Sequence, residues 1–209
     1  MRKLFTILCA SVVSALALTT VVSANDGTAD AGCPSGPSLH LLETQAKAGD
    51  LDAMAYLGEA LMHPDCAQEA RDKGLRMLVN AAEAGQPQAM FLIGIMVVAR
   101  HSEPEGSELG SDYIRRSAEA GHVEAEAWHG AMLMAEARGE AERDDAFYWL
   151  GSAASKGSVR AAMTVHHVYR AGMHGVQRDD CLAALWFDVA VMLQHPNVAQ
   201  TADADVTCN

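Results

Sequence analysis

Three side chains of the kinds that bind metal ions stand close together in the stretch AEAGHVEAEAWHG, residues 118–130. His122, Glu126 and His129 follow the spacing i, i+4 and i+7, so a helix would carry all three on one face. Imidazole and carboxylate groups are ordinary zinc ligands. Seven helical residues, however, rise ~10.5 Å, so two histidines at that separation share one ion only with distortion. The alternative, a satisfied or partly buried histidine, is favoured, and we predict no metal and no cofactor.

Other patterns that carry catalysis fail in this sequence. It contains no H-E-x-x-H of a metalloprotease, no G-x-S-x-G nucleophile elbow and no C-x-x-C. The S-x-x-K pattern of penicillin-recognising proteins also fails, because Ser155 stands three residues after Ser152 and Lys156 comes one residue too late. We therefore predict that the protein is not an enzyme, and we name no catalytic residue.

The N-terminal stretch MRKLFTILCASVVSALALTTVVSA is typical of a secretory signal peptide. Two cations precede an uncharged apolar run, and the run ends in Val22-Ser23-Ala24, which favours cleavage after Ala24. An uncleaved membrane anchor is the alternative, although the run is short and broken by Ser and Thr. We predict a periplasmic or secreted protein with no membrane insertion after cleavage.

The charge of the predicted mature chain limits its partners. From residue 25 onward it carries 13 Lys and Arg against 27 Asp and Glu, a formal charge of −14. Nucleic acid and anionic membrane surfaces would repel such a chain, so neither is predicted as a partner. Four cysteines also remain after cleavage, and an even number in an oxidising compartment indicates two disulfides with three possible connectivities. These are Cys33, Cys66, Cys181 and Cys208.

The stretch with the histidines is one copy of a unit that occurs four times. AKAG, AEAG, AEAG and ASKG end at glycines spaced by 36 residues, and an alanine follows four residues after each glycine. The glycines are Gly49, Gly85, Gly121 and Gly157, and the alanines are Ala53, Ala89, Ala125 and Ala161. A spacing held across four units indicates a repeat architecture.

One unit can be interpreted physically as two helices. Residues 50–63 have apolar side chains at helical spacing, a polar loop follows, and a second helix ends at the next glycine, where a C-cap belongs. Gly58 lies inside the first helix, where glycine costs ~1 kcal/mol relative to alanine, so its recurrence as Gly94 and Gly130 implies close packing. Such units bury their apolar faces only by stacking, which predicts an α-solenoid.

The predicted organisation has five parts. Residues 1–24 are the signal peptide, 25–37 a linker, and 38–194 the solenoid, with a tail at 195–209. Ser38 is the expected N-cap of a capping helix. The capping helix spans 38–48, and the repeats span about 49–84, 85–120, 121–156 and 157–194.

The fourth unit, VYRAGMHGVQRDDCLAALWFDVA, resembles the later half of the Sel-1-like repeat, a relative of the tetratricopeptide repeat. The resemblance implies an all-α, right-handed α-solenoid of about four helix-turn-helix repeats, with a role in holding another protein. Exported proteins of this family act as envelope adaptors, regulators or immunity proteins, for example against type VI lipase effectors. Other secreted relatives have been described as binding or hydrolysing β-lactams, and this is the alternative function.

The repeat also assigns different structural places to the three metal candidates. His122 follows the glycine in the place of Asp50, Gln86 and Ser158, where a polar residue at a helix start is ordinary. Glu126 and His129 take places that other units fill with apolar residues. His129 is therefore the unexplained residue of the stretch.

Transferring the concave face of tetratricopeptide-like solenoids to this chain gives a hypothetical partner-binding surface. Its centre is apolar, with acids toward the N-terminal end and arginines toward the C-terminal end, although several members could instead fill the core between repeats. The predicted set is Glu59, Met62, Phe91, Ile95, Glu124, Met134, Met163, His167 and Arg170. The partner implied is another protein, such as an effector toxin or an envelope component.

The ends of the solenoid suggest a disulfide connectivity. The capping helix runs antiparallel to the next helix, which brings Cys33 near Cys66. A tail folded back along the last helix would bring Cys208 to Cys181. We predict the pairs 33–66 and 181–208.

Overall fold

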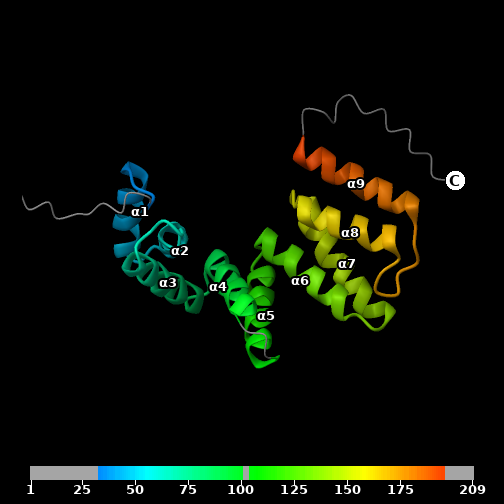
Figure 1. Cartoon of the computed structure of the whole chain (residues 1–209), viewed down its shortest axis with the longest axis horizontal. Helices are drawn as coiled ribbons and strands as arrows, with labels where there is room; N and C mark the ends of the chain where they lie inside the picture. Colours follow the sequence, from blue (N-terminus) through cyan, green and yellow to red (C-terminus); the bar gives the residue numbers. More distant parts are fainter. Residues whose placement is uncertain (1–32, 101–103, 196–209) are drawn as a thin grey trace, which may run out of the picture.

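A computed structural model describes residues 33–100 and 104–195 of the 209-residue chain. These residues form α-helices and no strand, and the predicted all-α solenoid is confirmed (Figure 1). The helices are α1 (Pro37–Lys47), α2 (Leu51–Leu61), α3 (Gln68–Glu83), α4 (Pro87–Arg100), α5 (Pro104–Glu119), α6 (Val123–Glu136), α7 (Glu140–Ser155), α8 (Val159–Ala171) and α9 (Asp180–Gln194).

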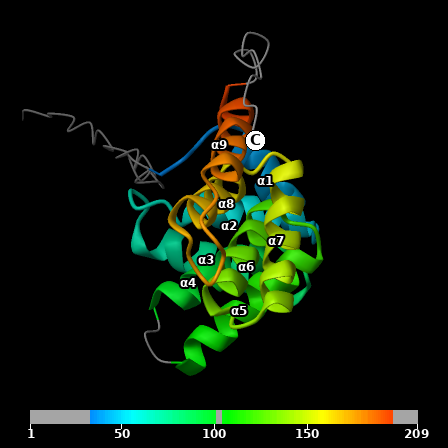
Figure 2. The same ribbon diagram turned by 90° about the vertical axis from the view of Figure 1, so that its right-hand side faces the viewer.

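The helices pack as consecutive antiparallel pairs, α2 with α3, α4 with α5, α6 with α7, and α8 with α9, while α1 covers the start of the array. Within the array, α2 also packs directly on α4, and α6 packs directly on α8. These contacts place first helices of consecutive repeats next to one another, on the inner side of the arc that Figure 1 shows, and Figure 2 views the array from one end. The second helices form the outer layer.

Each repeat begins with the same tight turn. The four repeated glycines have φ angles between 87° and 102°, a left-handed conformation that favours glycine. The next residue donates its backbone N–H to a carbonyl five residues earlier, as Asp50 does to Gln45, and so closes the preceding helix. Its side chain then caps the following helix, since Asp50 accepts from the N–H of Ala53 and Ser158 from that of Ala161.

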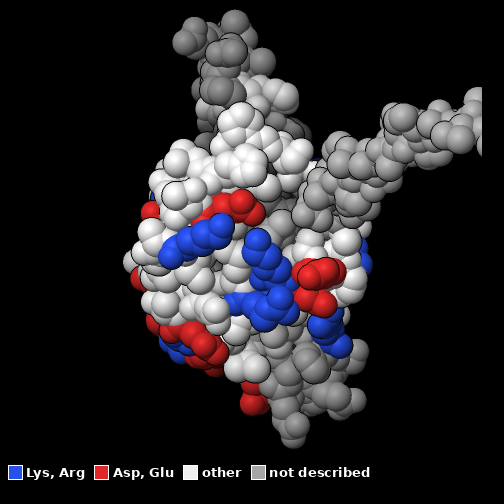
Figure 3. Space-filling view, turned by 90° about the vertical axis from the view of Figure 1, so that its left-hand side faces the viewer, with Lys and Arg blue, Asp and Glu red and all other residues white. Residues whose placement is uncertain are grey.

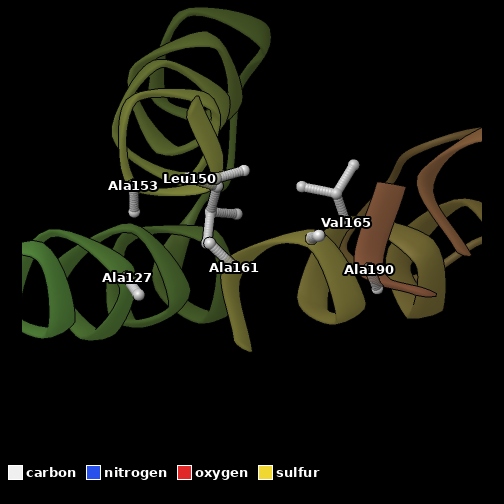
Figure 4. Packing of buried hydrophobic residues seen from close by; sticks show 8 residues of the cluster. Ala127, Leu150, Ala153, Ala161, Val165 and Ala190 are labelled. Atoms are coloured by element: carbon white, nitrogen blue, oxygen red, sulfur yellow. The ribbon is translucent and has the colours of Figure 1, made fainter. Parts of the chain in front are cut away.

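Small residues let the helices pack closely in the core. The four repeated alanines are all buried, with exposures of 3% or less. Figure 4 shows one part of this core, where α6, α7, α8 and α9 meet around small and aliphatic side chains. The labelled residues are Ala127, Leu150, Ala153, Ala161, Val165 and Ala190.

Glycine is required where the two helices of a repeat cross. A Cβ atom at Gly58 would lie 2.8 Å from Leu78 Cγ and 3.0 Å from the Gly74 carbonyl oxygen. A Cβ atom at Gly94 would lie 2.9 Å from the Gly110 carbonyl oxygen. At both crossings the two backbones are in direct contact, which accounts for glycine inside a helix despite its low helix propensity.

The N-terminal end of the solenoid is closed by α1 and a disulfide. Cys33 is bonded to Cys66, as predicted, which ties the segment before α1 to the turn after α2. The helix α1 begins one residue before the expected cap: Gly36 is the N-cap and Pro37 the first helical residue, because the fixed φ of proline suits that position. Figure 3 shows basic and acidic side chains lying next to one another at this end of the molecule, where Lys73 pairs with Glu43 at 3.6 Å.

The predicted signal peptide, the linker up to residue 32, the tail from residue 196 and therefore the Cys181–Cys208 pair lie outside the described residues. In the part that the structure describes, no single helix is long and apolar enough to cross a membrane. One pair meets the length and composition criteria together, α3 with α4, and it is bent by 117°.

Candidate functional site

One continuous set of first-helix side chains is exposed along the inner side of the array. It consists of three rows that repeat every 36 residues, and every member is at least partly exposed. We call this set the inner face: Asp52, Gln88, Glu124 and Arg160; Tyr56, Leu92, Trp128 and Thr164; Glu59, Ile95, Ala131 and His167.

Contacts between neighbouring repeats hold the inner face together. The Gln88 amide donates to the Glu59 carboxylate over 2.7 Å, from α4 to α2. In the last two repeats, the Arg160 guanidinium lies 5.4 Å from the ring centre of Trp128, a cation–π contact from α8 to α6. Gln88 and Arg160 are equivalent positions of two repeats, and each contacts the repeat that precedes its own. The surface is therefore ordered before any partner arrives, which lowers the entropic cost of binding.

Two residues of the predicted concave face are in the core, and this corrects the prediction. Phe91 is 8% exposed and packs on Ile114 and Ala118 of α5, while Met134 is 1% exposed and packs on Ala146 and Val168. Both fill the space between consecutive repeats, which is the packing alternative stated above. Ala55 and Ala127, in the same row as Phe91, are also fully buried.

The other predicted members keep access to solvent. Met62, Ile95 and Met163 are half-buried. Glu59, Glu124, His167 and Arg170 are exposed.

Sequence reasoning missed the row that contains Tyr56 and Trp128. It chose the row one residue earlier, and one residue turns a helix by 100°, from surface to core. A signal was available in the residue types: Ala55 and Ala127 are small enough to lie between helices, whereas the large aromatic residues follow directly after them. Tyr56 is 53% exposed.

The three metal candidates have separate partners in the structure. The His122 ring caps α6 by accepting from the Ala125 N–H over 3.2 Å, and it packs on Phe91 with ring centres 4.9 Å apart. His129 meets the Trp149 ring edge-on at 5.3 Å. Among the described residues, no group of three His, Cys, Asp or Glu side chains could hold a metal ion.

Glu126 is a buried acid in a place that other repeats fill with Met or Ala. It is 3% exposed, accepts from the Ser152 hydroxyl over 2.9 Å, and pairs with the Lys156 ammonium group. The near-match to S-x-x-K noted above is thus part of a polar contact between α6 and α7.

Burial controls the charge of both histidines. It lowers the pKa of His122 despite the nearby carboxylates of Glu124, Glu59 and Glu126, which act in the opposite direction. Burial likewise lowers the pKa of His129, with a further lowering from Arg115. Both rings are therefore favoured in the neutral form, which is the form that His122 needs to accept a hydrogen bond.

No protein-family model and no curated protein matches the chain. Several solved structures, however, match the chain. A protective antigen present in uropathogenic Escherichia coli strains, which displays an SLR fold, matches 73% of this chain with 26% identity and a TM-score of 0.59. A Sel1 repeat protein from Oxalobacter formigenes matches 74% of it with 23% identity and a TM-score of 0.60.

An immunity protein from Pseudomonas aeruginosa matches 74% of the chain with 17% identity and a TM-score of 0.52, a likeness of fold. The matches cover 32% of the E. coli antigen, 63% of the O. formigenes protein and 57% of the immunity protein. The repeats of this sequence and these structures together show that the described residues form a solenoid of Sel-1-like repeats.

Proposed function

We propose that this chain is a non-catalytic, exported protein-binding module that acts in the periplasm and holds its partner on the inner face. The observation that carries the proposal is the inner face itself, in which Tyr56 and Trp128 lie among polar and charged side chains of the repeats. Aromatic residues surrounded by polar groups are typical of interfaces. Two of the similar structures are an immunity protein and a protective antigen, and we propose the immunity role for this chain, with a lipase toxin as its target, over an adaptor role.

The charges of the inner face suggest how a partner would be oriented. Asp52 and Glu59 lie in the first repeat and Glu124 in the third, whereas Arg160 lies in the last. A complementary partner has basic groups facing the first three repeats and acidic groups facing the last. Charge complementarity of this kind fixes orientation and speeds association more than it adds affinity.

Capture of the partner from periplasmic extract tests the proposal. The mature protein carries either Glu124→Lys, on the inner face, or the matched change Glu83→Lys, on an exposed residue of the second helix α3. We expect Glu124→Lys to reduce the yield of the captured protein at least about tenfold and Glu83→Lys to leave it unchanged. Equal capture by both variants would show that the inner face does not bind the partner.

A further inference from the structure

The fourth repeat differs from the others where its two helices cross. The place of Gly58, Gly94 and Gly130 is taken by His166, which is 6% exposed. Its Nδ1 lies 2.8 Å from the Ala183 carbonyl oxygen of α9. A carbonyl oxygen only accepts, so Nδ1 donates, and in the neutral ring Nε2 holds the lone pair.

A pocket of about 380 Å³ opens beside this histidine, between α8 and α9. Its lining residues are His166, Arg170, Arg178, Asp180, Ala183, Ala184 and Phe187. Among the described residues, no fully buried side-chain nitrogen or oxygen lacks a partner. Nε2 of His166 has no hydrogen bond in this part of the chain, so it reaches solvent, and the pocket is the place where it does so.

The lining of the pocket contains two arginines and one aspartate. Arg178 and Asp180 neutralise one another through two hydrogen bonds of 3.0 Å. The neighbouring Asp179 is occupied in capping α9 through the Leu182 N–H. Arg170 forms no hydrogen bond or ion pair with another described residue, although its charge also acts on the carboxylate of Asp180. Arg170 also lines a second hollow with Ala171, Met173 and His167, the last of which belongs to the inner face.

One side of the pocket is apolar, with Ala183, Ala184 and Phe187 of α9, and a loop closed by hydrogen bonds lies beside it. The Phe187 ring is 45% exposed and lies 5.4 Å from the His166 ring. Gly172 ends α8 in the left-handed conformation, and the Asp179 N–H donates to the Tyr169 carbonyl over 3.0 Å. These bonds hold the loop between the two helices and position Arg178 at the rim.

We propose that the pocket beside Arg170 receives a carboxylate of the partner protein, from an Asp or Glu side chain. A guanidinium group binds a carboxylate through two parallel hydrogen bonds, and the ring of Phe187 can contact the methylene groups of the acid. The chain as a whole has a net charge of −12 and repels anions. Arg170, which has no hydrogen bond or ion pair within the described part of the chain, is therefore the feature that would attract a carboxylate to this site. The inference rests on the proposed function, because it names the chemistry of the partner at one end of the inner face.

The test is a titration of the full mature protein followed by two-dimensional NMR. The probe is N-acetyl-L-glutamate, and N-acetyl-L-glutamine, which has nearly the same shape without the side-chain charge, is the control ligand. We expect saturable shifts in the millimolar range, centred on the Arg170 side chain and residues 166–187, that are larger for the glutamate. Arg170→Gln should weaken binding at least about tenfold, whereas Arg76→Gln, at an exposed arginine of α3 outside the inner face, should not.

Equal shifts with both ligands, no shift with the glutamate, or unchanged binding to Arg170→Gln would each overturn the proposal. Arg170 is exposed, so the variant should keep its helical circular dichroism and its Tm. The same variant in the capture experiment separates the sources of the carboxylate. If it loses the glutamate but still captures the partner fully, the pocket binds a free carboxylate and the proposal for the partner is wrong; loss of both supports it. If Glu124→Lys does not affect capture, the proposed function fails independently of the pocket.

Discussion

The first and last repeats are both helix pairs, but they differ where the two helices cross, with a glycine in the first repeat and a histidine in the last. In the first, Gly58 brings α2 and α3 into backbone contact, and a disulfide closes the adjacent end. In the last, His166 stands in the place of Gly58, bonds across to α9, and lines an open pocket with Arg170. In a solenoid each repeat contacts only its neighbours. One repeat can therefore exchange close packing for a binding pocket without changing the others.

Removing the disulfide should produce the largest effect and should be confined to the first repeat. In the chain-entropy model, a cross-link over 33 residues contributes about 3–4 kcal/mol to the free energy of unfolding. We expect Cys33→Ala with Cys66→Ala to lose stability of this order in urea unfolding. Amide exchange should accelerate in α1 and α2 and stay unchanged in α8 and α9. Equal acceleration at both ends would show that the ends are not independent.

Adding one methyl group at the first crossing should also destabilise the protein. Gly58→Ala places a Cβ atom 3.0 Å from the Gly74 carbonyl oxygen, and we expect a net loss of about 1–3 kcal/mol. Gly151→Ala is the matched control in α7, where a Cβ atom meets nothing within 4 Å, and it should gain up to about 1 kcal/mol. Urea unfolding of both variants measures the difference. A gain in both would contradict the close crossing.

In the last repeat, the sensitive glycine is in the loop. Gly172 has a φ of 66°, and a Cβ atom there would lie 3.2 Å from the Arg178 backbone nitrogen. Gly172→Ala should cost about 1–2 kcal/mol and shift Arg178 at the rim of the pocket. Thermal unfolding measures the cost, and the NMR titration measures the affinity for N-acetyl-L-glutamate, which should fall. Unchanged affinity would show that the loop does not position the pocket.

The smallest effect should be a dependence of stability on pH through His122. Burial lowers its pKa in the folded protein below the ordinary value of 6.5, so the unfolded chain binds the proton more readily. Stability is therefore present above about pH 6.5 and is lost as the pH falls below it. His122→Asn keeps a side-chain acceptor for the cap and does not titrate.

The fall in Tm between pH 7.5 and 5.5 should accordingly be smaller in His122→Asn than in the unaltered protein. An equal fall in both proteins would exclude a contribution from His122.

The repeat made much of the fold predictable from sequence. The glycine turns, the polar caps that follow them and the Cys33–Cys66 bond all depend on local spacing or on the antiparallel packing of neighbouring helices. The partners of Glu126 were not predictable, because Ser152 and Lys156 lie in another helix and nothing in the local pattern indicates them. The pocket at His166 likewise depends on the distance between α8 and α9 and on the conformation of the loop.

The inner face was predicted only in part. Glu59, Glu124, His167 and Arg170 are exposed, as a surface requires, but Phe91 is buried, and the exposed aromatic row lies one position later, at Tyr56 and Trp128. The error arises because the repeat period is the same for both rows. Residue size distinguishes them, since alanine at 55 and 127 permits the close approach of consecutive first helices.

Photo-crosslinking in living cells tests the central claim most directly. The chain offers two exposed tyrosines for comparison: Tyr56, on the inner face, and Tyr148, which is 69% exposed on the second helix α7. Each is replaced in turn by p-benzoylphenylalanine, and the cells are irradiated before the protein is purified. We expect a single adduct of defined mass from position 56 and none from position 148. The same adduct from both positions, or an adduct from position 148 alone, would contradict the assignment of the inner face as the binding surface.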